Sequence, residues 1–245
     1  MINISYEVYS AKTVREQIIA EMKNGIFSEC ERLPRETMLS EKLGISRTQL
    51  RDILAALEQE GYITRRLGVG TMINRHVLNV KSRMDIEAEI LEIIRNNGYE
   101  PSVAFIDAVE DNADKLLSTK LGITEGTKVI RVSKVCLADG KPALYFQDIF
   151  DKGLVKKEYT QKDLEIPIFQ FLKEKCEVEV YMDLTQLHAV LADDEIGSAL
   201  GISAGTPLLN MEEVDYDIEG KTVFYSRQFF IDGLFEQTVL RKRLY

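Results

Sequence analysis

The stretch that decides the fold is LPRETMLSEKLGISRTQLRDILAALEQEGYITRRLGVGT, residues 33–71. Within it, four apolar residues recur at the spacing of one helical face, and they predict a helix over 46–60 that Gly61 ends. Those four residues are Leu50, Ile53, Leu54 and Leu57. The opposite face of this helix carries Arg47 and Arg51, which are four residues apart and therefore point outward together.

The flanking segments complete a recognisable order of elements. Met38, Leu39 and Leu43 predict a short helix that stops at Gly44, and a further helix is expected over 11–23, before Asn24-Gly25. Residues 62–74 have strand character around the glycines at 68 and 70, which predicts a hairpin. Three helices followed by a hairpin are the order of a winged helix-turn-helix domain.

The second helix of a helix-turn-helix pair lies in the major groove, where its first turn reaches base edges and phosphates. Arg47 or Arg51 could donate two hydrogen bonds to one guanine. Taken alone, the same arginines could be ordinary solvated side chains, and the surrounding elements favour the DNA-binding interpretation. Ser46 and Gln49 fit a capping box, so we expect Gln49 to serve the helix start more than DNA.

The hairpin over 65–71 places two cations beside two glycines. Arg65 and Arg66 precede Gly68 and Gly70, an arrangement that suits a wing lying along phosphates or a minor groove. The alternative is a plain hairpin whose glycines satisfy the turn geometry alone.

Bulk properties separate two parts of the chain. Its 245 residues suffice for two domains. Residues 1–76 hold 11 Lys and Arg against 10 Asp and Glu, a net of +1, whereas residues 77–245 hold 20 against 30, a net of −10. No apolar run is long enough for a membrane span or signal peptide, so we expect a cytoplasmic protein. Three cysteines without CxxC spacing and two histidines favour neither disulfides nor a metal site.

The second part of the chain contains an internal repeat. LGITEGT at 121–127 returns as LGISAGT at 200–206, and each copy continues with strand-like residues around a two-residue turn. The expected tips are Asp139-Gly140 and Glu219-Gly220. We therefore predict an α+β domain with an antiparallel sheet, with one extra residue in the second copy indicating a bulge.

The domain limits that we expect are 1–76 for the DNA-binding domain, 77–82 for a polar linker, and 83–245 for the second domain. An amphipathic helix should open the second domain, because apolar residues recur at helical spacing from Ile86 to Ile94, before Asn97-Gly98.

Residues 10–75 closely resemble the DNA-binding domain of the GntR family of bacterial regulators. The motifs are the Leu-Pro entry, L-G-x-S-R-x-x-x-R, E-x-x-G-x-I and R-R-x-G-x-G-T. The resemblance implies DNA contacts by Ser46, Arg47, Thr48 and Arg51, with Gly68 and Gly70 in the wing. Family members usually carry Ser and then Arg after the Leu-Pro, where this chain has Arg35 and Thr37. Either that arginine contact is absent here, or Arg35 makes it from a new position.

The remainder resembles the ligand-sensing UTRA domain of the HutC-type GntR subfamily, which is similar to the chorismate lyase fold. Phosphosugar-sensing members bind the anion with an R-x-R pair and a following glutamate. The matching positions here are Lys134, Cys136 and Phe146, which could equally be simple sheet residues. Because only Lys134 keeps the charge, we expect a less anionic effector. Further effector candidates are Ser82 and Arg83, expected near a helix start, and Tyr225 and Arg227 in the closing YSRQFFID.

The hypothesis from sequence is therefore a DNA-binding transcription regulator, with a small-molecule effector and no cofactor. By resemblance we expect a repressor that binds a palindromic double-stranded operator as a homodimer. Two alternatives stay open: an enzyme of chorismate-lyase-like fold, although no catalytic cluster is recognisable, and a constitutive DNA-binding protein without an effector.

Overall fold

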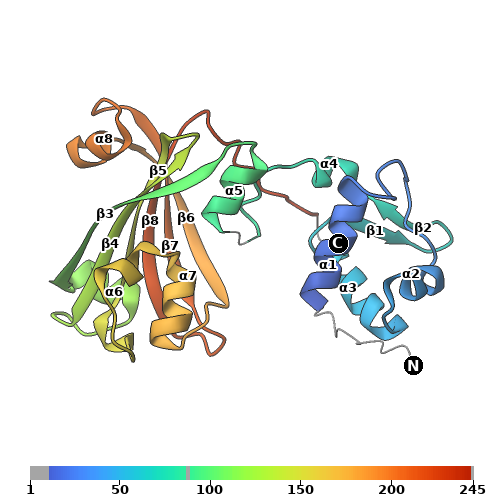
Figure 1. Cartoon of the computed structure of the whole chain (residues 1–245), viewed down its shortest axis with the longest axis horizontal. Coiled ribbons are helices and arrows are strands. Elements are labelled where there is room, and N and C mark those ends of the chain that lie inside the picture. The colour runs from blue at the N-terminus through green and yellow to red at the C-terminus, as the bar shows by residue number, and fades with distance from the viewer. Residues whose placement is uncertain (1–10, 87–88, 244–245) are drawn as a thin grey trace, which may run out of the picture. The chain divides into compact units, whose positions relative to one another are not determined.

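A computed structural model describes residues 11–86 and 89–243 and divides the chain into two compact units (Figure 1). The first unit is Met1–Ile86 together with Gln237–Tyr245, and the second is Glu87–Glu236. The first ten residues of the expected domain 1–76 lie outside the described residues.

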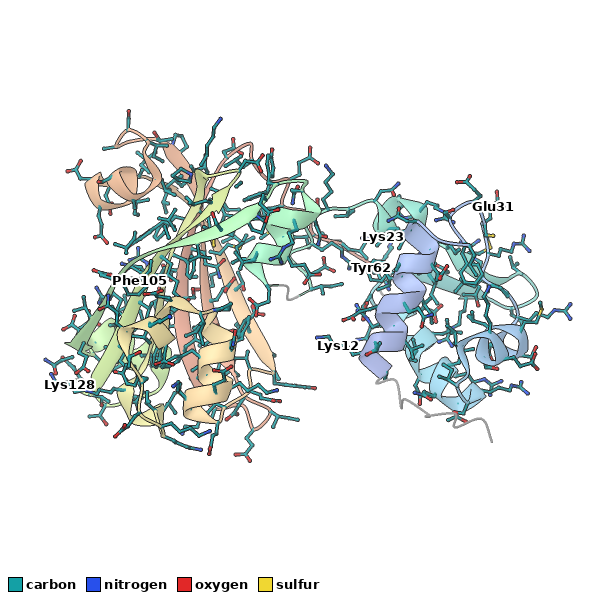
Figure 2. The ribbon with its side chains drawn as sticks, in the orientation of Figure 1. Lys12, Lys23, Glu31, Tyr62, Phe105 and Lys128 are labelled. Atoms are coloured by element: carbon teal, nitrogen blue, oxygen red, sulfur yellow. The ribbon has the colours of Figure 1, made fainter. Side chains whose placement is uncertain are left out.

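The first unit is a winged helix-turn-helix, as the sequence predicts. Its elements are α1 (Ala11–Lys23), α2 (Glu36–Leu43), α3 (Arg47–Gln59), β1 (Ile63–Arg66), β2 (Gly70–Ile73) and α4 (Arg75–Leu78). Lys12 and Lys23 mark the two ends of α1 (Figure 2). The helix expected over 11–23 is confirmed at both ends, and α2 ends at Gly44, whose positive φ of 66° suits glycine.

One hydrophobic core holds this unit together. Its most deeply buried side chains come from all three helices and the hairpin: Val14, Ile18, Met22, Leu39, Leu50, Leu54, Leu57 and Ile63. Arg15 of α1 pairs with Glu60 at the end of α3, with Nε 2.9 Å from Oε1. Arg75 donates to the carbonyl oxygens of Met22, Phe27 and Cys30, and so fixes α4 to the loop that follows α1.

The segment expected to be a linker, 77–82, begins inside α4. Val77 and Leu78 are buried, and Leu78 belongs to the core of the first unit. Two adjacent apolar residues give no periodic signal, so their burial was not predictable from pattern alone.

The second unit contains one six-stranded antiparallel sheet, in the order β3-β4-β5-β8-β7-β6. Its strands are β3 (Pro101–Asn112), β4 (Lys128–Ala138), β5 (Lys141–Asp151), β6 (Met182–Leu191), β7 (Pro207–Tyr216) and β8 (Thr222–Ile231). Its helical elements are α5 (Ile90–Asn96), α6 (Lys115–Leu121), η1 (Lys152–Leu154), η2 (Gln161–Glu165), α7 (Ile168–Phe171), the π-helical turn η3 (Leu172–Cys176) and α8 (Asp194–Leu200).

The internal repeat is confirmed as two equivalent halves of this sheet. Strands β3-β4-β5 and β6-β7-β8 follow the same path and meet at β5 and β8. Each half has one short helix, α6 or α8, capped by Asp114 or Asp193 at its start and by Gly122 or Gly201 at its end. The aspartates accept backbone hydrogen bonds that would otherwise be unsatisfied.

The two hairpin tips differ from each other. Asp139-Gly140 forms the expected two-residue turn, and both residues have positive φ, 52° and 75°. The prediction for Glu219-Gly220 is wrong, because β7 and β8 are joined by the longer loop 217–221. The carboxylate of Asp217 organises that loop by accepting from the backbone nitrogens of Glu219 and Lys221, each at 2.9 Å. The expected irregularity in the second copy lies at Asp215/Tyr216.

Each face of the sheet is covered differently. Even-numbered residues of β4, β5 and β8 share one face, the α7 face, where Phe150 packs on Phe171 with ring centroids 5.5 Å apart. Figure 1 shows α7 over this face, and Phe105 of β3, labelled in Figure 2, packs against the same cluster. Odd-numbered residues form the α6/α8 face, where Tyr145 packs with α8 and Tyr225 with α6.

Candidate DNA-binding surface and effector site

Helix α3 is built to present a polar face. Ser46 precedes its first turn, and the Ser46 Oγ accepts from the backbone nitrogen of Gln49 at 3.1 Å. The reciprocal bond of a capping box, from the Gln49 side chain, is not formed within the described residues. The four predicted apolar residues are all buried, which leaves Arg47, Thr48 and Arg51 exposed on the opposite side.

Two of the predicted DNA-binding cations are held by carboxylates. Arg51 Nε lies 2.7 Å from Glu36 Oε2 at the start of α2, and this pairing raises the pKa of the guanidinium further. Arg65 Nε lies 2.7 Å from Glu58 Oε2. Both pairs are solvent-accessible, so they hold the arginines in place without making much of a contribution to stability.

The other predicted cations are unengaged. Arg35, Arg47 and Arg66 are exposed, and their side chains form no ion pair within the described residues. Thr37 is also exposed, in the first turn of α2. The structure thus places exposed guanidinium groups at the start of α2, on α3 and on the wing, all within the first unit.

The wing has the glycines that the sequence predicts. Gly68 and Gly70 have φ of 77° and 106°, a region that other residues rarely adopt. Two further wing features were missed by sequence reasoning. Arg32, which pairs with Met72 outside the named strands, donates to the Val69 carbonyl at 3.1 Å, and Leu67 is fully exposed at the tip.

In the second unit, three of the expected effector residues share the α7 face. Lys134 and Phe146 are direct partners across β4 and β5, with the lysine Nζ 6.0 Å from the ring centroid. Cys136 lies two residues further along β4 and pairs with Leu144. Burial raises the pKa of the Cys136 thiol to about 12, so it is an un-ionised, unreactive group.

Lys134 is a buried cation, only 2% exposed. Its Nζ donates to the Ile166 carbonyl at 2.5 Å, beneath the segment that covers this face. Burial lowers the pKa of Lys134, while the nearby carboxylate of Asp148 opposes that shift. In this buried, low-dielectric environment, a hydrogen bond from the ammonium group to a ligand would be stronger than in water.

Asp148 is the residue of this site that sequence reasoning missed. It is 2% exposed, and its Oδ1 accepts from Ser226 Oγ at 2.9 Å across β5 and β8. Its Oδ2 is buried and has no hydrogen-bond partner within the described residues. Burial raises the pKa of Asp148 to about 6. An acidic residue inside a largely apolar strand is the signal that could have drawn attention to it.

Tyr225 and Arg227 are not brought together with Lys134. As odd-numbered residues of β8, they belong to the α6/α8 face. The ring of Tyr225 lies 5.2 Å from Lys120 Nζ, and Lys120 also pairs with Glu212 at 3.1 Å. The guanidinium of Arg227 lies 5.1 Å from the ring of Phe229.

Ser82 and Arg83 belong to the first unit, and no helix begins at them, since α5 starts at Ile90. Ser82 is buried and donates to Gln237 at 2.8 Å, while Arg83 pairs with Asp85. These two side chains therefore make structural contacts within the first unit.

Comparison with known proteins agrees with both halves of this description. The family described as "Bacterial regulatory proteins, gntR family" matches residues 10–73, and the UTRA domain matches residues 96–232, more than half of the chain. The chain belongs to the GntR family, HutC type. It is a transcription regulator that joins a DNA-binding GntR domain to an effector-binding UTRA domain.

Curated relatives of this GntR regulator cover most of its length. HTH-type transcriptional repressor NagR of Bacillus subtilis is 23% identical over 86% of this chain and 85% of its own. The histidine utilization repressor of Pseudomonas putida is 25% identical over 80% and 77%. Among solved structures, YydK from Bacillus subtilis has a TM-score of 0.74 at 19% identity, covering 93% of this chain and 99% of YydK. That similarity confirms the fold.

Further findings concern the described residues alone. None of their helices has the length and apolar character needed to cross a membrane. Nor do they contain a group of three or more His, Cys, Asp or Glu side chains placed to hold a metal ion. The three cysteines are free thiols, with Cys136 and Cys176 buried.

Proposed function

We propose that this GntR regulator is a cytoplasmic homodimeric repressor that binds a palindromic operator and responds to a small metabolite. The observation that carries the proposal is the exposed face of α3, which presents Arg47 and Arg51 in the same unit as a wing that turns at two glycines of positive φ. A dimer would place one such helix in each half-site. The names of two curated relatives, which are called repressors, support the direction of regulation.

The DNA contacts that we propose divide into two kinds. Arg47 and Arg51 would contact base edges from α3, with Ser46 and Thr48 near the backbone. On the wing, Arg65 and Arg66 would contact phosphates. Arg35 and Thr37 would face the DNA backbone from the start of α2. Arg35 would then make the DNA contact that family members usually make with the arginine two residues further on. Gln49, half-buried at the helix start, is assigned a supporting role.

For the effector, we propose the α7 face around Lys134, with Cys136 and Phe146 as neighbours. Lys134 and Asp148 together bring one positive and one negative charge to this face. Such a pair suits a ligand that offers both an acceptor and a donor, rather than a strongly anionic phosphosugar. This assignment leaves out Tyr225 and Arg227, which lie on the α6/α8 face, and Ser82 and Arg83, which make contacts within the first unit.

For the dimer, we propose that edge strand β6 takes part. Among the described residues it pairs with β7 alone, and it exposes large apolar side chains on both faces: Met182, Leu184, Leu187 and Leu191. Exposed apolar side chains on an unpaired edge strand favour association with a second copy. We infer no catalytic role, because the family and its curated relatives regulate transcription.

The testing experiment is selection of duplexes from a random pool by the purified protein, followed by sequencing and salt titration of the winner. A palindromic consensus, together with a dimer in sedimentation, is expected. Lack of enrichment over non-specific binding would overturn the proposal. A metabolite panel read by thermal stability separates this regulator from a constitutive DNA-binding protein, since only a true effector raises Tm by mass action.

A further inference from the structure

The chain passes between its two compact units twice. It leaves the first unit near Ile86, and it returns at Gln237 after completing the sheet of the second. Residues 237–242, which we call the C-terminal strap, then pack on the DNA-binding unit. The strap therefore belongs structurally to the unit that carries the recognition helix.

Backbone hydrogen bonds hold the strap against segment 82–85. Met84 N donates to Thr238 O at 2.9 Å, and Thr238 N donates to Ser82 O at 3.2 Å, which forms a short parallel bridge. Leu240 N donates to the Asp85 carboxylate at 3.2 Å. Two of these bonds form one isolated parallel bridge, and the third joins a strap backbone nitrogen to a side chain.

The strap also contacts the end of α3 directly. Lys242 Nζ donates to the Gln59 carbonyl at 2.7 Å and to that of Glu58. The last carbonyls of a helix lack partners within the helix, and a cation there is favourable. Leu240 packs so closely on Gly61 that a Cβ at that position would collide with Leu240 Cδ2. Gly61 thus both ends the recognition helix and makes room for the strap.

Arg83 links these contacts into one cluster. It pairs with Asp85, which itself accepts from the strap, and it donates to the Glu60 carbonyl at 2.7 Å. Its guanidinium lies 5.2 Å from the ring of Tyr62. The strap, segment 82–85 and the end of α3 are therefore tied together through one arginine.

At its other end, the strap continues from β8. Only residues 232–236 separate it from Ile231, the last residue of that central strand. The same strand carries Ser226, which donates to Asp148 on the α7 face. The chain thus runs without a break from the strand that carries Ser226 to Lys242, whose hydrogen bonds complete the connection to the end of α3.

We propose that the C-terminal strap is a second coupling element between the two units. Through it, a change in the conformation or dynamics of β8 alters those of the recognition helix α3, and the reverse. The inference rests on the proposed function. A ligand that favours either the docked or the released state of the strap changes how often the strap contacts the end of α3. It thereby shifts the affinity of the protein for DNA. Reciprocity requires that DNA binding also changes the dynamics of β8, which allows a test without a known effector.

The test measures hydrogen–deuterium exchange of the full chain, with and without the duplex selected by the wild-type protein. The strap variant is Leu240→Ala with Lys242→Ala, and the single Lys242→Ala serves as a milder variant, because Lys242 is exposed and its removal leaves no cavity. Arg241→Ala is the matched control, since Arg241 is exposed and its side chain makes no ion pair or hydrogen bond within the described residues.

Without DNA, amides of 82–85 and 60–62 should exchange about tenfold faster in the strap variant, and as in wild type in Arg241→Ala. With DNA, wild type and Arg241→Ala should show altered exchange in 222–231. The double variant should lose that change, and Lys242→Ala should reduce it. Two results would overturn the coupling proposal while leaving the proposed function intact. One is a DNA-dependent change in exchange of 222–231 that is undiminished in the double variant, and the other is no such change in a wild type that binds DNA. Failure of wild type to bind any duplex would overturn the proposed function as well.

Discussion

The Nε atom of Arg51 lies 2.7 Å from Oε2 of Glu36, so a carboxylate of α2 engages one of the two arginines on the recognition helix. The Arg51 side chain is 59% exposed and that of Glu36 is 29% exposed. Ion pairs of this kind contribute little to stability. The carboxylate nevertheless adds negative charge at the surface that we propose for DNA, and it competes with phosphate or guanine for Arg51.

Glu36→Gln should therefore strengthen DNA binding at low salt, by several-fold, while leaving Tm almost unchanged. The measurement is affinity for a fixed duplex across a salt series. Glu41→Gln, an exposed glutamate on the same helix without an ion pair in the described structure, controls for the change in net charge. Equal strengthening by both variants would show that only net charge matters.

Arg47→Ala should abolish specific operator binding and leave the fold intact. Arg47 is exposed, and its side chain is unpaired within the described residues, so its removal costs no folded-state contact. A bidentate contact to guanine contributes roughly 1 to 3 kcal/mol of discrimination. Affinity for the selected duplex and for a scrambled one is compared with Lys23→Ala, which removes a cation at the far end of α1. Unchanged specific affinity would remove Arg47 from the interface.

Local pattern was sufficient to predict the DNA-binding unit. Apolar periodicity and glycine positions predicted the helix ends, because α1, α2 and α3 each bury one apolar stripe and end one or two residues before a glycine. Exposure of Arg47 followed from the same stripe. The pairing of Arg51 with Glu36 did not, since it joins residues 15 apart whose distance depends on how two helices cross.

Prediction of the effector site was less complete for a related reason. The resemblance to the HutC-type subfamily pointed to Lys134, and sequence comparison of the two copies predicted the strands β4 and β5. It could not reveal that Asp148 faces Ser226, because that contact forms where the two copies join, 78 residues apart in sequence. Nor could it assign Tyr225 and Arg227 to the other face, which depends on the register of β8 against β5.

Asp148 predicts a specific pH dependence of stability. Its pKa is raised by burial from an ordinary value of 3.8 to about 6, so the folded state binds the proton more tightly than the unfolded state. Its contribution is therefore fully present below pH 3.8 and is lost as pH rises through 6, by up to roughly 3 kcal/mol.

Asp148→Asn keeps the shape of the side chain and an acceptor for Ser226. Because asparagine does not titrate, the variant should not lose free energy of unfolding as the pH rises through 6. The free energy of unfolding by urea, measured between pH 4 and 8, should exceed that of wild type at pH 7 and show a smaller decline over this range. Asp107→Asn, at an exposed position on β3, should retain the wild-type profile. An unaltered pH profile in Asp148→Asn would mean that Asp148 is not the titrating group.

Lys134→Ala should change the effector response without changing DNA affinity in the effector's absence. The lysine is buried on the α7 face, with one hydrogen bond to the Ile166 carbonyl, so it remains able to donate to a ligand. Thermal stability in a metabolite panel identifies the compounds that raise Tm of wild type, and these should lose their effect in the variant. Lys134→Met, which keeps most of the volume without the charge, separates loss of the ligand contact from a cavity effect. Lys128→Ala, on the same strand but exposed, should respond as wild type does. An equal Tm response in both Lys134 variants would place the effector elsewhere in the UTRA domain.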